Sequence, residues 1–221
     1  MNLKLIYVDT TFWRAEVARL TLFIGDIEFE DVRIKREDFI QAKSSGVLED
    51  GTILPFRQIP CLVVDGVSIA QTAGIARFCG KLAGLYPKED DVKAALVDQY
   101  VDFATDLNVM VSSTGSIQDQ DSRLKARQEL ADGPLKRKLE ILEGLIPDNS
   151  DSIMASGLSI ADIAIWRILG WLSSGMLDGL PTDILSPFPN IKRVCLAVDG
   201  HQKVQRWVSE TYPANYVRGN Y

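Results

Sequence analysis

The chain has 221 residues, which is enough for one large domain or two small ones with a buried core. Hydrophobic residues make up 46% of it and charged residues 24%, a composition that excludes collagen-like, coiled-coil and wholly disordered classes. The 30 acidic and 24 basic side chains give a formal net charge of -6, so we expect no general attraction to nucleic acid or to an anionic membrane. A local basic pocket for an acidic small molecule remains compatible with that charge.

Cysteine and histidine are scarce. The three cysteines are an odd number, which argues against a disulfide scaffold and for a reducing compartment, and the single histidine, His201, cannot build a His-rich zinc site. The amino-terminal residues enter a strand pattern directly, without the leader and cleavage site of a secretion signal, so we predict a cytoplasmic protein. The apolar stretch over 158–176 contains Asp162 and Arg167, which favours a buried helix over a membrane span.

The first half of the chain alternates strand and helix patterns. Residues 3–8 predict a strand that is covered on both faces and has Tyr7 near its carboxyl end. Apolar residues at helical spacing then predict a helix that ends at Gly25; they are Trp13, Val17, Leu20 and Ile24. The remaining elements of this half are a strand over 28–34, a polar segment over 38–45, an acidic loop over 46–52, a hairpin with strands 61–64 and 67–70 around Asp65-Gly66, and a helix marked by Ile75, Phe78, Cys79 and Leu82.

The second half has no comparable strand pattern and is predicted to be helical. The four helical patterns cover 92–110, 123–145, 159–172 and 191–208. Ser159 and Asp162 have the spacing of a capping box at the start of the third. A charged linker near residue 88 separates the halves, so we expect domains over 1–86 and 92–221.

Four motifs in this order resemble those of a known family. They are Leu5-Ile6-Tyr7 with Arg14-Ala15-Glu16 after it, the run from Leu54 to Pro60, the run from Asp65 to Phe78 with Gln71-Thr72, and Ser159-Ile160-Ala161-Asp162. The sequence resembles the cytosolic glutathione S-transferases, and among them the sigma class, which includes glutathione-dependent prostaglandin D synthase and the S-crystallins. The resemblance implies an α/β thioredoxin-like amino-terminal domain (βαβ-ββα) that binds glutathione, and an all-α domain that forms the electrophile site and part of a homodimer interface.

The resemblance also implies where glutathione binds. A cis bond between Ile59 and Pro60 would let the Ile59 backbone pair with the cysteinyl part of the peptide. The γ-glutamyl carboxylate would bind at Gln71-Thr72, where Thr72 can also cap the next helix. The remaining implied contacts are Phe39, which replaces the tryptophan of the sigma pattern, Lys43, Gln58 and, from the neighbouring subunit, Asp106.

The catalytic hypothesis concerns Tyr7 and Arg14. A thiol with a pKa of about 8.5 is only about 5–10% thiolate at neutral pH, and the thiolate is the nucleophile. A hydroxyl that donates to the sulfur, with a cation nearby, favours the anion, and a shift of ~2 pKa units corresponds to about 2.7 kcal/mol. Tyr7 is the expected donor and Arg14 the expected cation. Trp13 stands where the sigma pattern has glycine, and the loop is one residue longer. Thr10 or Thr11 are therefore alternative hydroxyl donors to the thiol, and Trp13 could alternatively fill the electrophile pocket.

The second substrate is less defined by the sequence. Phe12, Trp13, Phe103 and Met110 are candidates for an apolar wall, and core packing is an equal interpretation of each. Asp102 and Asp106 lie one helical turn apart, but Thr105 replaces a third acid of prostaglandin D synthase, so we expect no metal. The leading hypothesis is conjugation of glutathione to hydrophobic electrophiles, as in detoxification. The alternatives are glutathione-dependent isomerisation of a lipid endoperoxide, and glutathione binding without turnover, as in a crystallin.

Overall fold

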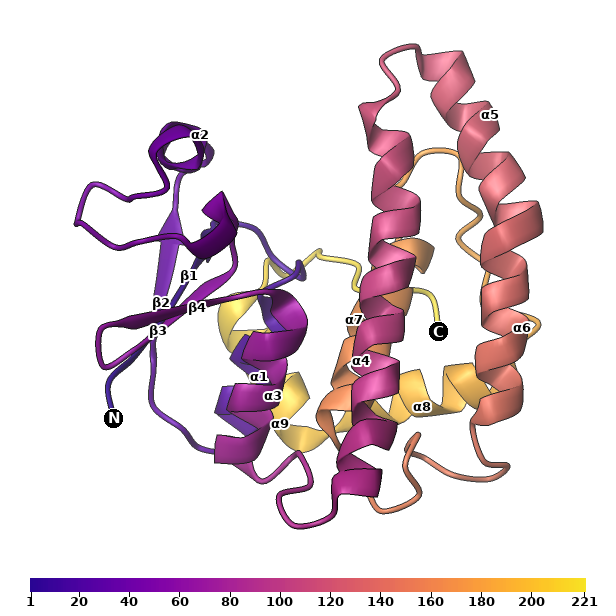
Figure 1. Ribbon diagram of the computed structural model, residues 1–221. Coiled ribbons are helices and arrows are strands. Elements are labelled where there is room, and N and C mark those ends of the chain that lie inside the picture. The colour runs from indigo at the N-terminus through magenta and orange to yellow at the C-terminus, as the bar shows by residue number, and fades with distance from the viewer. The chain divides into compact units, whose positions relative to one another are not determined.

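The structure, a computed structural model, describes residues 1–221. It divides into two compact units, Met1–Asp90 and Asp91–Tyr221, whose elements are labelled in Figure 1. The first unit carries all the strands, and the second is built of helices.

A four-stranded mixed sheet forms the centre of the first unit. Its strands are β1 (Leu3–Val8), β2 (Glu30–Ile34), β3 (Cys61–Val64) and β4 (Val67–Ala70), and they lie in the order β2-β1-β3-β4. β1 is parallel to β2 and antiparallel to β3, and β3 and β4 form a hairpin. The hairpin turns at Asp65 and Gly66, both with positive φ, as the Asp-Gly pair predicts. The predicted bounds of β1, β3 and β4 are confirmed.

Helices and apolar side chains cover both faces of this sheet. α1 (Glu16–Ile24) and α3 (Thr72–Ala83) pack side by side on one face, where their core includes Leu5, Tyr7 and Leu62 (Figure 1). On the other face Ile6 packs with Ala42, which belongs to α2 (Arg36–Ser45). Both faces of β1 are therefore buried, as the run of apolar residues in it predicts.

One local prediction in this unit is wrong, and one segment predicted only as polar has regular structure. The first helix begins at Glu16, so Trp13 lies in the preceding turn, where its carbonyl accepts a hydrogen bond of 3.0 Å from the Glu16 N–H. The polar segment over 38–45 belongs to a complete helix, α2, in which Ala42 alone is fully buried. A helix with so little buried surface leaves almost no apolar period in the sequence.

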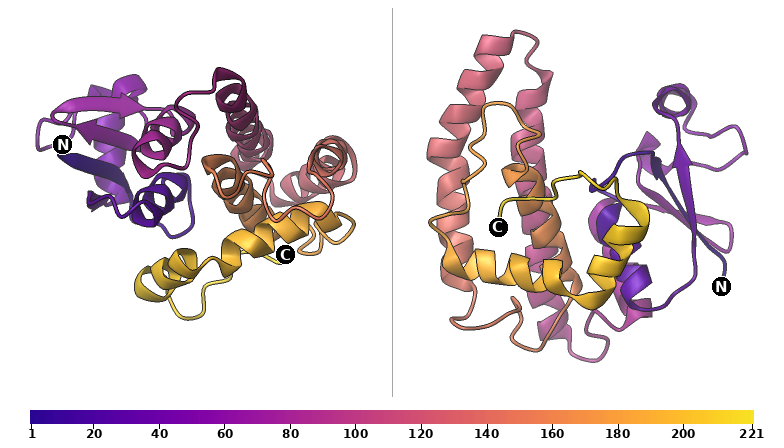
Figure 2. Two further views of the ribbon diagram at one scale, coloured as in Figure 1. Left: turned by 90° about the horizontal axis from the view of Figure 1, so that it is seen from below. Right: turned by 180° about the vertical axis from the view of Figure 1, so that it is seen from behind.

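The second unit contains six α-helices, and its core surrounds α7. Their bounds are α4 (Asp91–Ser112), α5 (Gln120–Leu130), α6 (Lys136–Leu145), α7 (Ile160–Ser173), α8 (Pro189–Gly200) and α9 (Gln202–Thr211), and a π-helical turn, Ala131–Leu135, joins α5 to α6. α8 crosses one end of α6 and α7 (Figure 2). The pattern over 191–208 predicts one helix, whereas the chain breaks at His201, whose extended backbone separates α8 from α9.

Every residue of α7 is buried, which confirms the prediction of a buried helix in the apolar stretch. The predicted capping box is also present: the Ser159 side chain accepts from the Ala161 N–H, and the Asp162 carboxylate accepts from the Ser159 N–H. No helix of the structure combines the length and the apolar character that a membrane crossing requires.

Candidate active site

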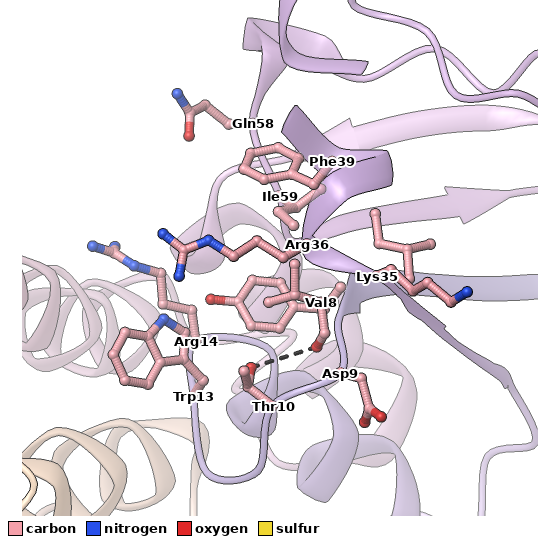
Figure 3. A pocket seen from close by; sticks show the side chains of 12 residues that line it. Val8, Asp9, Thr10, Trp13, Arg14, Lys35, Arg36, Phe39, Gln58 and Ile59 are labelled. Carbon is pink, nitrogen blue, oxygen red and sulfur yellow. Dashed lines mark hydrogen bonds between the residues drawn. The ribbon is translucent and has the colours of Figure 1, made fainter. Parts of the chain in front are cut away.

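A cavity of about 500 Å³ opens in the first unit at the carboxyl end of β1 (Figure 3). Four stretches of chain that are far apart in the sequence line it: the end of β1, the β1–α1 loop, the junction of β2 with α2, and the loop before β3. The lining residues are Tyr7, Val8, Asp9, Thr10, Trp13, Arg14, Ile34, Lys35, Arg36, Phe39, Gln58 and Ile59.

Tyr7 is the one residue of the cavity lining that is fully buried. It is 3% exposed, and its ring belongs to the core cluster between the sheet and the helices. β1 fixes its position, because Tyr7 is paired with Arg33 of β2 in the register of the sheet. A phenol held in this way can present its hydroxyl at the cavity wall with little loss of side-chain freedom.

The β1–α1 loop brings Trp13 and Arg14 to the same cavity. Phe12 has a φ of 56°, a left-handed conformation that is uncommon for a bulky residue. Thr10 donates to the carbonyl of Val8, through its N–H at 2.8 Å and its hydroxyl at 3.4 Å, so its side chain is turned back on its own loop (Figure 3). The structure thus brings Thr10 to the cavity beside Tyr7, while Thr11 is not among the lining residues.

Charged side chains, of which Arg19 is fully buried, hold this loop to the sheet. Arg19 has no exposed surface, and its Nε donates to Asp31 at 2.9 Å while Nη1 lies 3.4 Å from the Thr10 carbonyl. Arg33 donates to the other oxygen of Asp31 at 2.9 Å and to Asp9 at 3.4 Å. Burial opposes the charge of Arg33, but these carboxylates outweigh it and raise its pKa.

Six of the predicted site residues therefore line one cavity: Tyr7, Trp13, Arg14, Phe39, Gln58 and Ile59. The Ile59–Pro60 bond is cis, as predicted. Lys43 lies on α2 beyond the lining residues, and its side chain is exposed.

Gln71 and Thr72 stand where β4 ends and α3 begins. Gln71 precedes the helix with a φ of 73°, and Thr72 is the first helical residue. The prediction that Thr72 caps α3 is wrong, because no side chain makes a capping hydrogen bond there. The Thr72 hydroxyl, now inside the first turn, no longer has the position from which a cap reaches the following N–H groups.

Phe12 differs from its predicted place. Its side chain has no exposed surface, and it is not among the residues that line the cavity. The left-handed backbone at Phe12 directs the next two residues, Trp13 and Arg14, to the cavity instead.

The predicted residues of the second unit share one side of α4. Phe103, Asp106 and Met110 follow at spacings of three and four residues. Lys138 of α6 binds two of them, since its Nζ lies 3.8 Å from an Asp106 carboxylate oxygen and 5.2 Å from the centre of the Phe103 ring. Asp106 itself is exposed.

None of the three cysteines can act in this cavity. All are free and buried, and burial raises the pKa of Cys79 to about 12. Burial also raises the pKa of Cys61 and, well above the ordinary range, that of Cys195. Such thiols stay protonated at neutral pH and are poor nucleophiles.

Sequence reasoning missed several lining residues, among them the acidic Asp9 at the end of β1 and two basic residues, Lys35 and Arg36. The two basic residues follow the end of β2 directly. The sequence pattern could have indicated these two basic residues. They follow a strand that runs parallel to β1, so they must lie at the same end of the sheet as Tyr7.

A thioredoxin-like sheet unit followed by a helical unit defines the glutathione S-transferase fold, which confirms the predicted fold class. Residues 105–211 match the family model described as "Glutathione S-transferase, C-terminal domain". Glutathione S-transferase 1 of Ascaris suum is 30% identical over 212 residues, which cover 94% of this chain and 95% of the relative. Glutathione S-transferase S1 of Drosophila melanogaster is 26% identical over 199 residues, 89% of this chain and 74% of the relative.

Solved structures agree with these relatives. The prostaglandin synthase D of Nilaparvata lugens superposes with a TM-score of 0.81 at 26% identity and covers 96% of this chain and 99% of its own. The chain belongs to the glutathione S-transferase family and is a glutathione S-transferase enzyme.

Proposed function

We propose that the enzyme binds glutathione in the cavity of the first unit, stabilises its thiolate with the Tyr7 hydroxyl, and adds the sulfur to a hydrophobic electrophile. The observation that carries this proposal is that Tyr7, Arg14, Gln58 and Ile59, which come from three separate stretches of chain, line one cavity. Arg14 supplies positive charge at this site. A hydroxyl donor and a cation together lower the pKa of a bound thiol.

The peptide lies between the loop before β3 and the start of α3 in this proposal. The Ile59 backbone before Pro60 pairs with the cysteinyl residue, and Gln58 adds a hydrogen bond. Gln71 and the first amides of α3, beginning with Thr72, receive the γ-glutamyl carboxylate, since a helix amino terminus favours an anion. Phe39 and Lys43 receive the glycyl end.

The helical unit contributes the remaining functions. We assign residues 92–221 to the electrophile site, with Phe103 and Met110 in its wall, and to part of a homodimer interface. Asp106 reaches the γ-glutamyl amine of the neighbouring subunit. We place the enzyme in the cytoplasm and in the sigma class, with glutathione as its co-substrate and no metal, nucleic acid or membrane as a partner. Light scattering tests the dimer, because a monomer would overturn the role of Asp106.

The thiolate mechanism is tested by following thiolate absorbance of bound glutathione against pH. We expect the wild-type protein to lower the thiol pKa and Tyr7→Phe to restore its ordinary value. Tyr86→Phe is a matched control, because Tyr86 is a buried tyrosine of the same unit that does not line the cavity. Glutathione that binds without a lowered pKa would overturn the mechanism, and a lowered pKa that survives in Tyr7→Phe would transfer the role to Thr10 or Thr11.

A second candidate reaction, isomerisation of a lipid endoperoxide, is favoured by the likeness to the Nilaparvata lugens prostaglandin synthase D. The two reactions differ in the fate of glutathione. Conjugation consumes the free thiol in proportion to product, whereas isomerisation returns it. Measuring free thiol alongside the electrophile or the endoperoxide therefore separates them.

A further inference from the structure

The cavity contains positive charge that no protein group neutralises. Arg14 and Arg36 both line it, and neither guanidinium has a hydrogen bond or an ion pair to another residue. Asp9 is the acidic residue of the lining, and its carboxylate is already paired with Arg33. In a chain of net charge -6, this cavity is a local basic site.

The two arginines converge. Figure 3 shows the guanidinium groups of Arg14 and Arg36 extending to the same side of the cavity as the indole of Trp13, although they come from different elements. Lys35 precedes Arg36 in the chain and also touches the cavity, but its ammonium group extends in the opposite direction in the same view. The basic site is therefore built by Arg36 with Arg14, and Lys35 stands outside it.

Arg36 is not placed to stabilise its own helix. It is the first residue of α2, where the helix dipole disfavours a cation. Two guanidinium groups on one side of a cavity favour an anion between them. Arg36 is exposed, so an anion that enters the cavity can reach its guanidinium.

Glutathione leaves Arg36 without a partner in the proposed function, on which this inference rests. The thiolate is assigned to Tyr7 and Arg14, the γ-glutamyl carboxylate to the start of α3, and the glycyl carboxylate to Lys43. We propose that Arg36, together with Arg14, binds a carboxylate of the second substrate, so that the enzyme prefers electrophiles with a carboxylate attached to an apolar body. The planar guanidinium matches a carboxylate in a bidentate pair, and the rings of Trp13 and Phe39 offer the apolar contact.

The test compares conjugation of chlorodinitrobenzoate with that of neutral chlorodinitrobenzene by wild type, Arg36→Gln and Lys35→Gln. We expect Arg36→Gln to lower kcat/KM for the benzoate by about tenfold and that for the neutral compound by less than about twofold. Lys35→Gln removes the same charge from the neighbouring residue. It should change the ratio of kcat/KM for the benzoate to kcat/KM for the neutral compound by less than about twofold. Added salt should reduce the preference of the wild type for the benzoate over the neutral compound. Equal effects of the two substitutions on the benzoate would overturn the proposal.

The carboxylate that meets Arg36 could instead be one of glutathione's own, and a second measurement distinguishes the two sources. Isothermal titration calorimetry measures glutathione affinity directly. If Arg36→Gln weakens glutathione binding and slows both electrophiles alike, Arg36 holds the peptide and the proposal fails. Unchanged glutathione affinity with selective loss of the benzoate supports it.

Failure of the proposed function is separately visible. If the wild type binds glutathione but conjugates neither electrophile, the conjugation reaction is rejected. Equilibrium binding of the two preformed glutathione conjugates then tests Arg36 without turnover. We expect the carboxylated conjugate to bind more tightly to the wild type and to lose that advantage in Arg36→Gln, and equal affinities in the wild type would overturn the inference.

Discussion

Replacing Asp162 by alanine should lower the free energy of unfolding by about 2–4 kcal/mol, because it deprives buried donors of their acceptor. Asp162 has no exposed surface, and its two oxygens accept from the Ile153 N–H at 2.6 Å, the Ser159 N–H at 2.7 Å and the Ser159 hydroxyl at 2.8 Å. Each buried N–H left without an acceptor costs about 1–3 kcal/mol, which gives about 2–6 kcal/mol for the two backbone groups. Burial raises the pKa of Asp162 against the effect of these hydrogen bonds, so its charge is itself costly to bury and the lower part of the range applies.

Urea unfolding followed by tryptophan fluorescence measures this loss of unfolding free energy. Trp166 and Trp171 report on it because they lie on α7, the helix that begins at the capping box of Ser159 and Asp162. Ser159→Ala should cost about 1 kcal/mol, because it removes a single cap bond of 3.2 Å to the Ala161 N–H. In the double variant the two losses should fall short of additive, because Ser159 and Asp162 also bind each other.

Asp119 provides the control. It caps α5 with one hydrogen bond of 2.8 Å from the Ser122 N–H, but it is exposed. Asp119→Ala should therefore destabilise the protein much less than Asp162→Ala. A loss at Asp162 no larger than that at Asp119 would refute the argument that burial sets the cost.

Three further outcomes are expected. Lys4 binds Asp50 at 2.7 Å and lowers the pKa of that carboxyl to about 2, below its ordinary 3.8. The pair is solvent-accessible and should contribute less than about 1 kcal/mol to the free energy of unfolding. This contribution should be present above about pH 4 and should be lost as the pH falls through about 2. The difference in stability between wild type and Asp50→Asn should therefore vanish over that pH range. Gly25→Ala should destabilise by about 1–3 kcal/mol in thermal unfolding, because the new Cβ would lie 2.5 Å from that of Ala83; an unchanged Tm would contradict this packing. Cys79, whose pKa is raised to about 12, should react with a disulfide reagent only after denaturation, as thiol counts with and without urea would show.

Much of the first unit follows from local sequence. The apolar run in 3–8 and the Asp-Gly turn predict β1 and the β3–β4 hairpin at their observed bounds, because strands buried on both faces and tight turns have strong local signatures. α2 has no such signature, since its residues mostly face water. The break at His201 also has no local sequence signature, because the helical spacing of apolar residues continues across it into α9.

The candidate site divides in the same way. Tyr7, Arg14, Gln58 and Ile59 are predicted through motifs, and the structure brings them to one cavity. Arg36 belongs to no motif; the predicted βαβ order places it at the same end of the sheet as Tyr7, and the structure shows that it lines the cavity.

The sequence alone determined the fold class through the local patterns of its strands, turns and helices, and its motifs carried the resemblance that implied the family and the cis Ile59–Pro60 bond. Only the tertiary structure decided that Phe12 is buried while Trp13 faces the cavity, and that Arg36 rather than Lys35 extends beside Arg14. The reason is physical. Which way a loop side chain points depends on one or two backbone angles, such as the φ of 56° at Phe12, and contacts from distant segments select those angles.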